Sequence, residues 1–361
     1  MRSRRLRRHR TIPLLLGLVL VLAACTNSGT TTTTAADTEA ATVTTGDVST
    51  DTSAPEGSGS DVADLSLAGY TIGVAVVGTQ HFWDREAFEG AVAEVERLGG
   101  EVVTTDGGRD NAVHAENHDI FLTQKVDAVI TILGDSAVEP KLEALQAAGI
   151  PVFGVDHASP FVVNNTGSDN FYAGESAGRL MADAIGGEGK VAVFNAFSEA
   201  LKFCGDRYNT WKYVLDSAYP GIEVIQPELA EEFANAPENA RQQTLDLLEQ
   251  YPVGELDAIH VACWDQPAIG VVEALKEAGR TEIVVSAIDA GPDTLEIMME
   301  DGSPWVVNVA QQPRKIATIA VDNAARYLAG ETVLPQSYVD VVPVSGPAQA
   351  AAVYEQLGYG D

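Results

Sequence analysis

Carboxylates, aromatic side chains, two histidines, one arginine and one glutamine stand shortly after apolar runs along this sequence. Flat aromatic faces cover C–H surfaces, while carboxylate and guanidinium groups make charge-assisted hydrogen bonds to hydroxyl groups. A set of this kind, gathered in one cavity, suits a small polyhydroxylated molecule. The candidate ligand-binding residues are His81, Phe82, Trp83, Asp84, Asp156, His157, Arg207, Trp264, Asp289 and Gln311.

Two carboxylates near these positions have a second role open to them. Asp265 is placed to cap a helix that begins at Gln266, and we favour the capping role for it. Asp289 is placed to help cap a helix after Pro292, but we favour ligand contact for it. Phe203 is expected to serve in packing.

Catalysis is an alternative use of the carboxylates. A glycosidase would need an acid/base pair, and Asp84, Asp156 and Asp289 are the residues that could supply it. The sequence holds no nucleophile elbow, phosphate loop or HExxH motif. Carboxylates are also good acceptors for hydroxyl groups, so we interpret these residues as binding groups, and we expect no enzyme and no cofactor.

A metal site is a second alternative. His114 and His118 stand four residues apart on a predicted helix, a spacing at which two imidazoles can bind zinc. This helix is an early one, and we expect it to lie away from the cavity. We therefore predict no metal site.

The elements that must position these residues alternate along the chain from residue 70 onward. The run 71–78 is β-branched and bounded by glycine, which indicates a buried strand. Residues 86–98 carry apolar side chains at helical spacing, and the glycine pair 99–100 ends that helix. Further strands are predicted at 101–105, 127–133, 151–155, 190–195, 222–227, 258–263, 282–288, 305–309 and 338–344, with helices at 112–125, 137–148, 172–185, 206–218, 238–251, 268–278, 292–300 and 314–328.

Repeated strand–helix units with continuous apolar strands indicate parallel sheets that are covered by helices on both faces. The strands are too numerous for one sheet, so the predicted fold class is α/β with two doubly wound parallel-sheet lobes. Ligands bind such sheets outside the carboxyl ends of the strands, which is where the candidate residues stand.

The N-terminal 24 residues have the layout of an export signal. Arginines precede an apolar stretch from Ile12 to Leu22, which is shorter than the ~20 apolar residues of a membrane-spanning helix. Cys25 follows small residues, as in a lipobox, so we predict a signal peptide over 1–24 and a lipid anchor to the cell membrane on Cys25. Residues 25–64 are rich in Thr and Ser and are predicted to form a disordered tether.

The chain is strongly acidic, with 22 basic and 52 acidic residues and a net charge of −30 at pH 7. Such a charge disfavours binding to nucleic acid and to anionic headgroups. Besides Cys25, the cysteines are Cys204 and Cys263. In an oxidising compartment this pair could form a disulfide or remain as two buried thiols.

From about residue 70 to about residue 344, the chain resembles the ribose/galactose-type (type 1) periplasmic binding proteins that feed ABC importers. Each matching motif is short, and it is their order and spacing together that carry the resemblance. The matching segments are Phe82-Trp83 with Phe88-Glu89-Gly90-Ala91, Asp127–Ile130, Gly149–Val152 with Val155-Asp156, Ser168-Asp169-Asn170 with Gly174, Arg207 with Trp211, and Ala310-Gln311-Gln312-Pro313.

The resemblance implies two lobes that are joined by a three-strand hinge and close over one ligand. The chain would cross between the lobes near Asn170, Ala290 and Gln311. The implied domains are an N-terminal lobe of 65–169 plus 312–338 and a C-terminal lobe of 170–311 plus 339–361.

Two positions depart from the pattern of the ribose binders. His157 stands where they have an arginine, which exchanges a bidentate donor for a smaller titratable group. Trp264 stands where they have an asparagine, which exchanges a polar contact for a flat apolar surface. Phe233 falls near an aromatic position of the opposing lobe. These departures speak against ribose as the ligand.

The resemblance implies a monomeric, lipid-anchored receptor outside the cytoplasm that captures a monosaccharide, pentose or polyol and delivers it to an ABC permease. A ligand sensor for chemotaxis or for a histidine kinase would use the same scaffold. A nucleoside or an amine is an alternative ligand, since aromatics with several carboxylates can also cage a cation.

Overall fold

The computed structural model describes residues 65–360. The predicted signal peptide over 1–24, lipid attachment at Cys25 and tether over 25–64 lie outside the described residues. Among the helices of residues 65–360, none has the length and apolar character needed to cross a bilayer.

The first of two sheets is built from the N-terminal strands together with one strand from near the C-terminus. Its order is β11-β5-β4-β3-β1-β2, and all of its neighbouring strands are parallel. Central strands β1 and β3 are almost wholly buried, as their β-branched sequences require. The strands are β1 (Thr71–Val76), β2 (Glu101–Asp106), β3 (Ala128–Ile132), β4 (Val152–Val155), β5 (Asn164–Ser168) and β11 (Gln336–Val339).

The second sheet repeats this order as β12-β10-β9-β8-β6-β7. Its strands are parallel except β12, which runs antiparallel to β10, whereas the sequence predicted parallel strands throughout. The prediction of two doubly wound sheets is confirmed. The strands are β6 (Glu188–Phe194), β7 (Gly221–Val224), β8 (Ala258–Val261), β9 (Val284–Ser286), β10 (Trp305–Ala310) and β12 (Val342–Ser345).

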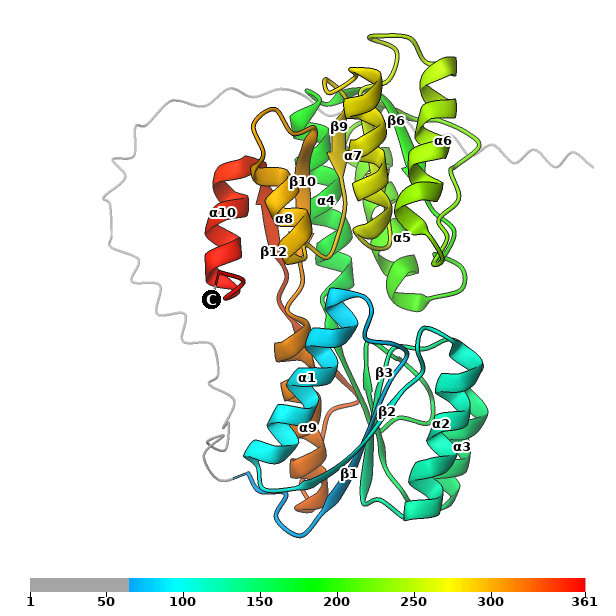
Figure 1. Cartoon of the computed structure of the whole chain (residues 1–361), viewed down its shortest axis with the longest axis vertical. Coiled ribbons are helices and arrows are strands. Elements are labelled where there is room, and N and C mark those ends of the chain that lie inside the picture. Colours follow the sequence, from blue (N-terminus) through cyan, green and yellow to red (C-terminus); the bar gives the residue numbers. More distant parts are fainter. Residues whose placement is uncertain (1–64, 361) are drawn as a thin grey trace, which may run out of the picture. The chain divides into compact units, whose positions relative to one another are not determined.

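Helices cover both faces of the first sheet (Figure 1). On one face α1 (Phe82–Arg97) packs against α9 (Pro313–Leu328), and on the other α2 (Asn111–Gln124) packs against α3 (Glu139–Ala147). Apolar cores lie under both helix pairs. We call this sheet with its four helices the first lobe.

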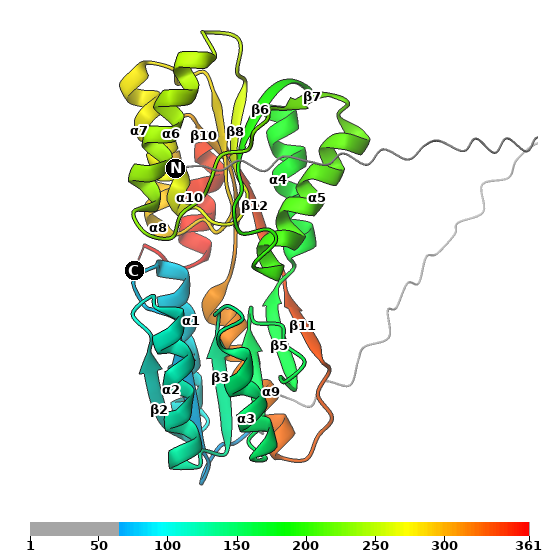
Figure 2. The same cartoon turned by 90° about the vertical axis from the view of Figure 1, so that its right-hand side faces the viewer.

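The second sheet is covered in the same way, and with its helices it forms the second lobe (Figure 2). One face carries α4 and α5, which pack closely together, while α6 packs against α7 and α8 against α10. Two apolar cores again separate the helices from the sheet. The helices are α4 (Asn170–Ala184), α5 (Lys202–Ala218), α6 (Ala236–Gln250), α7 (Gln266–Ala278), α8 (Pro292–Met299) and α10 (Gly346–Gln356).

Within residues 65–360 the chain crosses between the lobes three times. It crosses from β5 into α4, from β10 into α9, and from β11 into β12. The crossover predicted near Ala290 is wrong, because β9, α8 and β10 on either side of it all belong to the second lobe. The single strand predicted at 338–344 is in fact two strands in different sheets, and the third crossing lies between them. The predicted bounds of the two lobes, 65–169 with 312–338 and 170–311 with 339–361, stay a prediction.

Two elements were not predicted, and one begins earlier than expected. β5 reads Asn-Asn-Thr-Gly-Ser and has no apolar residue, yet all of it is buried. Its polar side chains have partners within the lobe: Asn164 Nδ2 donates to the Leu334 carbonyl at 2.8 Å, and Thr166 Oγ1 donates to Asn164 Oδ1 at 2.8 Å. The C-terminal α10 was also missed. Helix α1 begins at Phe82 rather than at residue 86, which places the predicted aromatic loop on its first turn.

Candidate ligand-binding site

Arg207 is the centre of a buried polar group between the lobes. It projects from α5 and is 2% exposed. Its Nε donates to Asn170 Oδ1 at 2.7 Å and its Nη2 donates to Gln311 Oε1 at 3.0 Å. Its Nη1 donates to the Cys263 carbonyl and lies 3.5 Å from Asp289 Oδ1. These four partners come from four separate segments of the chain, so they hold the guanidinium in one place.

Two predicted carboxylates meet this arginine. Asp156 directly follows β4 and Asp289 follows β9, and both have a positive φ that non-glycine residues rarely adopt. Asp156 Oδ2 lies 3.9 Å from Arg207 Nη2. Burial raises the pKa of Asp156 to about 6 and that of Asp289 to about 7, although the charge of Arg207 opposes the shift. Near neutral pH, Asp289 can therefore both donate and accept hydrogen bonds.

The first lobe contributes an ion pair to the same place. Arg109 Nη2 donates to Asp84 Oδ2 at 2.6 Å. The guanidinium carbon of Arg109 also lies 5.4 Å from the centroid of the Trp264 ring, a cation–π contact between the lobes. Sequence reasoning missed Arg109. The available signal was its place three residues after β2, at the same carboxyl edge as the other site residues.

These side chains line one cavity. Trp83, Trp264, Phe203 and Phe233 supply its aromatic walls. Phe203, expected only to pack, thus lines the cavity, and its ring centroid lies 5.2 Å from the guanidinium carbon of Arg207.

Several buried polar atoms at this cavity have no hydrogen-bond partner among the described residues. They are the indole nitrogens of Trp83 and Trp264, Nε of Arg109, and Oδ2 of Asp156. An unpaired buried polar atom costs free energy, which a bound ligand with hydroxyl groups would recover. Three N–H donors and one carboxylate acceptor match a ligand that both accepts and donates hydrogen bonds.

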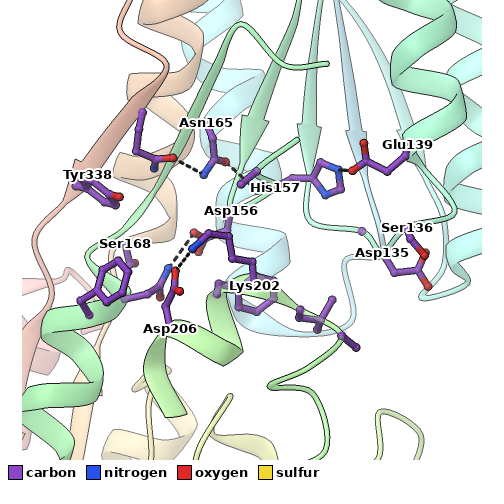
Figure 3. Close-up of a pocket in the computed structure, with 18 residues that line it drawn as sticks. Asp135, Ser136, Glu139, Asp156, His157, Asn165, Ser168, Lys202, Asp206 and Tyr338 are labelled. Atoms are coloured by element: carbon purple, nitrogen blue, oxygen red, sulfur yellow. Dashed lines mark hydrogen bonds and ion pairs between the residues drawn. The ribbon is translucent and has the colours of Figure 1, made fainter. Parts of the chain in front are cut away.

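His157 does not line this cavity. It lines an adjoining pocket, and Asp156 lines both this pocket and the cavity. His157 Nε2 lies 3.3 Å from Glu139 Oε1, and the backbone N–H of His157 donates to Asn165 Oδ1 at 2.9 Å (Figure 3). The role predicted for His157 as a ligand contact stays a prediction.

His81 and Phe82 join the lobes across the mouth of the cavity. His81 Nε2 lies 3.3 Å from Asp265 Oδ1, and Asp265 Oδ2 accepts from the backbone N–H of Gly291 and from Thr294 Oγ1, each at 3.1 Å. Asp265 is the N-cap residue of α7, but the capping role favoured for its side chain is wrong, because that side chain accepts no hydrogen bond from a backbone N–H of the helix. Phe82 packs on Gly291, where an added Cβ would lie 2.5 Å from the phenyl ring.

The carboxylates around His81 determine its charge. Burial lowers the pKa of His81, but the hydrogen bonds and charges of Asp265 and Asp84 outweigh this effect and raise it to about 10. Ligand atoms of His81, Asp265 and Asp289 also lie within 4.8 Å of one another, a spacing open to a metal ion. Because the carboxylate of Asp265 already has four partners, we interpret the group as a protonated imidazole between carboxylates.

His114 and His118, considered above as a zinc pair, are buried in the first lobe. His118 Nδ1 lies 2.8 Å from the His114 carbonyl oxygen and His118 Nε2 lies 3.1 Å from Thr131 Oγ1, so both of its nitrogens have partners within the protein. Burial lowers the pKa of His114 to about 3 and that of His118 to about 4. Both imidazoles are neutral packing groups at physiological pH.

The sulfur atoms of Cys204 and Cys263 are bonded to each other. This disulfide ties the start of α5 to the segment that follows β8. Together with Ala236 and Trp264, the two half-cystines form a small apolar cluster next to the cavity.

Comparison with known proteins decides the family. The family model of the periplasmic binding protein domain matches residues 72–332, which includes most of both lobes and every candidate ligand-binding residue. The chain belongs to this family of periplasmic binding proteins. It is 36% identical to a solute-binding protein of an ABC transporter from Agrobacterium vitis that was solved with bound allitol, with a TM-score of 0.77 over 81% of this chain and 100% of that one.

Two further relatives extend the comparison. A subunit of an ABC sugar transporter from Rhodobacter sphaeroides is 39% identical, with a TM-score of 0.74 over 78% of this chain and 99% of that one. The xylitol-binding protein of Mycolicibacterium smegmatis is 27% identical over 54% of this chain, and the match spans 55% of that protein's length. The relatives are binding proteins rather than enzymes.

Proposed function

We propose that this protein is an extracytoplasmic solute-binding protein that captures a small polyol or monosaccharide between its two lobes for import by an ABC permease. One observation carries the proposal. Unpaired N–H donors and an unpaired carboxylate oxygen, all buried, surround a cavity with aromatic walls. Hydroxyl groups satisfy donors and acceptors alike, while the C–H face of a polyol packs on indole rings.

The relatives support the same class of ligand. The Agrobacterium protein was solved with allitol, and the Mycolicibacterium relative is named for xylitol. Both are acyclic polyols. An extracytoplasmic location follows from the family. Lipid attachment at Cys25 and a monomeric state belong to the proposal, and mass spectrometry of the mature N-terminus from the membrane fraction would test the anchor.

A panel of ligands tests the proposal through thermal stabilisation of the purified protein. Allitol, xylitol, ribose, a nucleoside and a quaternary amine should be compared at equal concentrations. A ligand at 100 times its Kd adds about 2.7 kcal/mol to the stability of the folded state, which is a shift of several degrees in Tm. Stabilisation by the nucleoside or the amine alone would contradict the proposal, as would no stabilisation by any polyol or sugar.

A matched pair of arginine variants tests whether this cavity is the site. Arg207→Lys removes the fork that contacts Asn170 and Gln311, and it should weaken polyol binding at least about thirtyfold, the equivalent of about 2 kcal/mol. Arg280→Lys is the control, because Arg280 is also buried in the second lobe but donates to the Tyr251 carbonyl and Glu282, away from the cavity. Equal loss of affinity in both variants would count against the assigned site.

A further inference from the structure

We propose that the disulfide between Cys204 and Cys263 is a positioning element of the ligand site, so that ligand affinity depends on its oxidation state. The inference rests on the proposed function, because it concerns the same cavity. Its basis is the place of the bond among the residues that line that cavity.

The second lobe lines the cavity with two separate segments, and the disulfide joins them. One segment is the start of α5, which carries Phe203 and Arg207. The other follows β8 and carries Trp264. Cys204 is adjacent to Phe203 and three residues before Arg207, while Cys263 is adjacent to Trp264, and their Cα atoms are 4.7 Å apart. Each cysteine of the disulfide is therefore adjacent in sequence to an aromatic residue that lines the cavity.

A hydrogen bond links the same two segments. The carbonyl of Cys263 accepts from Nη1 of Arg207, so the position of this loop also fixes the guanidinium. The neighbouring carboxyl of Glu231 is 4% exposed and interacts with the backbone N–H groups of Ala196 and Cys263. The backbone at Cys263 is thus held by the disulfide on one side and by polar partners on the other.

Within its own lobe Trp264 packs in the apolar cluster that contains the disulfide and Ala236. Its indole nitrogen has no hydrogen-bond partner among the described residues. The ring contacts of Trp264 are with Phe233, which is 48% exposed, and with His81 and Arg109 of the first lobe. When the lobes separate, the first-lobe contacts are lost, and the disulfide cluster is what keeps the indole ring in place for the next ligand.

Pre-organisation of this kind changes affinity because a loosened wall must be ordered again on binding. Reordering the Trp264 and Arg207 side chains should weaken binding roughly tenfold. Calorimetric titration with allitol tests this in three forms of the whole protein: oxidised, reduced with excess dithiothreitol, and Cys204→Ala/Cys263→Ala. Reduction converts the bond to two thiols as dithiothreitol becomes its cyclic disulfide, so the double variant should not respond to the reagent.

A control separates positioning from general stability. Leu247→Ala opens a cavity in the core of the second lobe, away from the ligand site, and should lower the Tm while leaving allitol affinity within about twofold. Affinity that falls equally in Leu247→Ala would overturn the proposal. So would a reduced protein and a double variant that bind within about twofold of the oxidised protein.

A spectroscopic measurement tests, in the absence of ligand, whether the disulfide positions Trp264. The chain has four tryptophans, and 5-fluorotryptophan labelling gives each its own ¹⁹F signal, with that of Trp264 assigned from Trp264→Phe. Reduction should broaden or split the Trp264 signal and leave that of the buried Trp305 unchanged. An unchanged Trp264 signal would refute the positioning role. Failure of the oxidised protein to bind any polyol or sugar would instead refute the proposed function.

Discussion

Closure of the cleft is expected to take up one proton at His81. In this structure, where His81 of the first lobe contacts Asp265 of the second, the imidazole lies 3.3 Å from Asp265 Oδ1 and 3.7 Å from Asp84 Oδ1, and its pKa is raised to about 10. Asp289 and Asp293 also act on it electrostatically. Opening the lobes removes Asp265 and exposes the imidazole to water, so its pKa falls back toward the ordinary value of about 6.5 and is held somewhat above it by Asp84 of the same lobe.

The size and sign of the effect follow from these two pKa values. Protonation favours the closed form, so this contribution is fully present below about pH 6.5 and is lost as the pH rises through about 10. Closure should take up close to one proton at pH 8, where Asp156 and Asp289, whose pKa values are about 6 and 7, are mostly ionised and add little to the uptake. Ligand affinity should fall roughly tenfold between about pH 7 and pH 8.5.

Calorimetry in two buffers measures this proton directly. Titrations at pH 8 in phosphate and in Tris differ in observed heat by the number of protons taken up multiplied by the difference in buffer ionisation enthalpy. His81→Gln keeps a donor for Asp265 but cannot titrate, so its heats should be the same in both buffers. Equal heats for the unmodified protein at pH 8 would refute the reasoning, as would one proton still taken up by His81→Gln.

Three further predictions concern closure, the cavity and folding. Gly291→Ala places a methyl group 2.5 Å from the Phe82 ring, so it should weaken ligand binding at least about tenfold with little change in the Tm of the ligand-free protein; unchanged affinity would contradict this contact between the lobes. Arg109→Gln removes the ion pair with Asp84 and should weaken ligand binding about tenfold in calorimetric titration. An effect below about twofold would show that Arg109 is not part of the ligand site. Burial lowers the pKa of three histidines in the folded state, so their contribution is present above about pH 6.5 and is lost as the pH falls, by about 2 kcal/mol each at pH 5 (His114, His118 and His260). Buried Asp156, Glu231 and Asp289 have raised pKa values and act in the opposite direction, so the loss is measured as the difference in the free energy of unfolding between the protein and His260→Gln in urea at pH 7.5 and 5.0. A difference that does not change with pH would refute it.

The fold was predictable from the sequence because its signals are local. Continuous β-branched runs such as 71–78 and glycine stops such as 99–100 define strands and helices without knowledge of their partners. The polar strand β5 gives no such signal, because the side chain of its Asn164 is satisfied by residues about 170 positions away in sequence. The crossover near Ala290 was predicted wrongly for a related reason. The sheet to which a strand belongs depends on the strands that pair with it, and the sequence of one strand does not specify those partners.

Part of the candidate site was predictable because the carboxyl ends of parallel strands lie at the same edge of a doubly wound sheet. Asp156, Asp289 and Gln311 meet around Arg207 on that principle. Asp265 was misjudged because its position before α7 suits a cap, while its actual partner, His81, lies 184 residues away on the other lobe. Contacts between lobes of this kind carry no local signal.

The central claim is that the cavity around Arg207 holds one small polyol, and calorimetric titration of the purified protein with allitol tests it most directly. The account predicts a saturable isotherm with one site per chain, with the affinity lost in Arg207→Lys and retained in Arg280→Lys. Absence of binding heat for allitol, xylitol and the monosaccharides at millimolar concentration, in a protein that unfolds cooperatively, would contradict it.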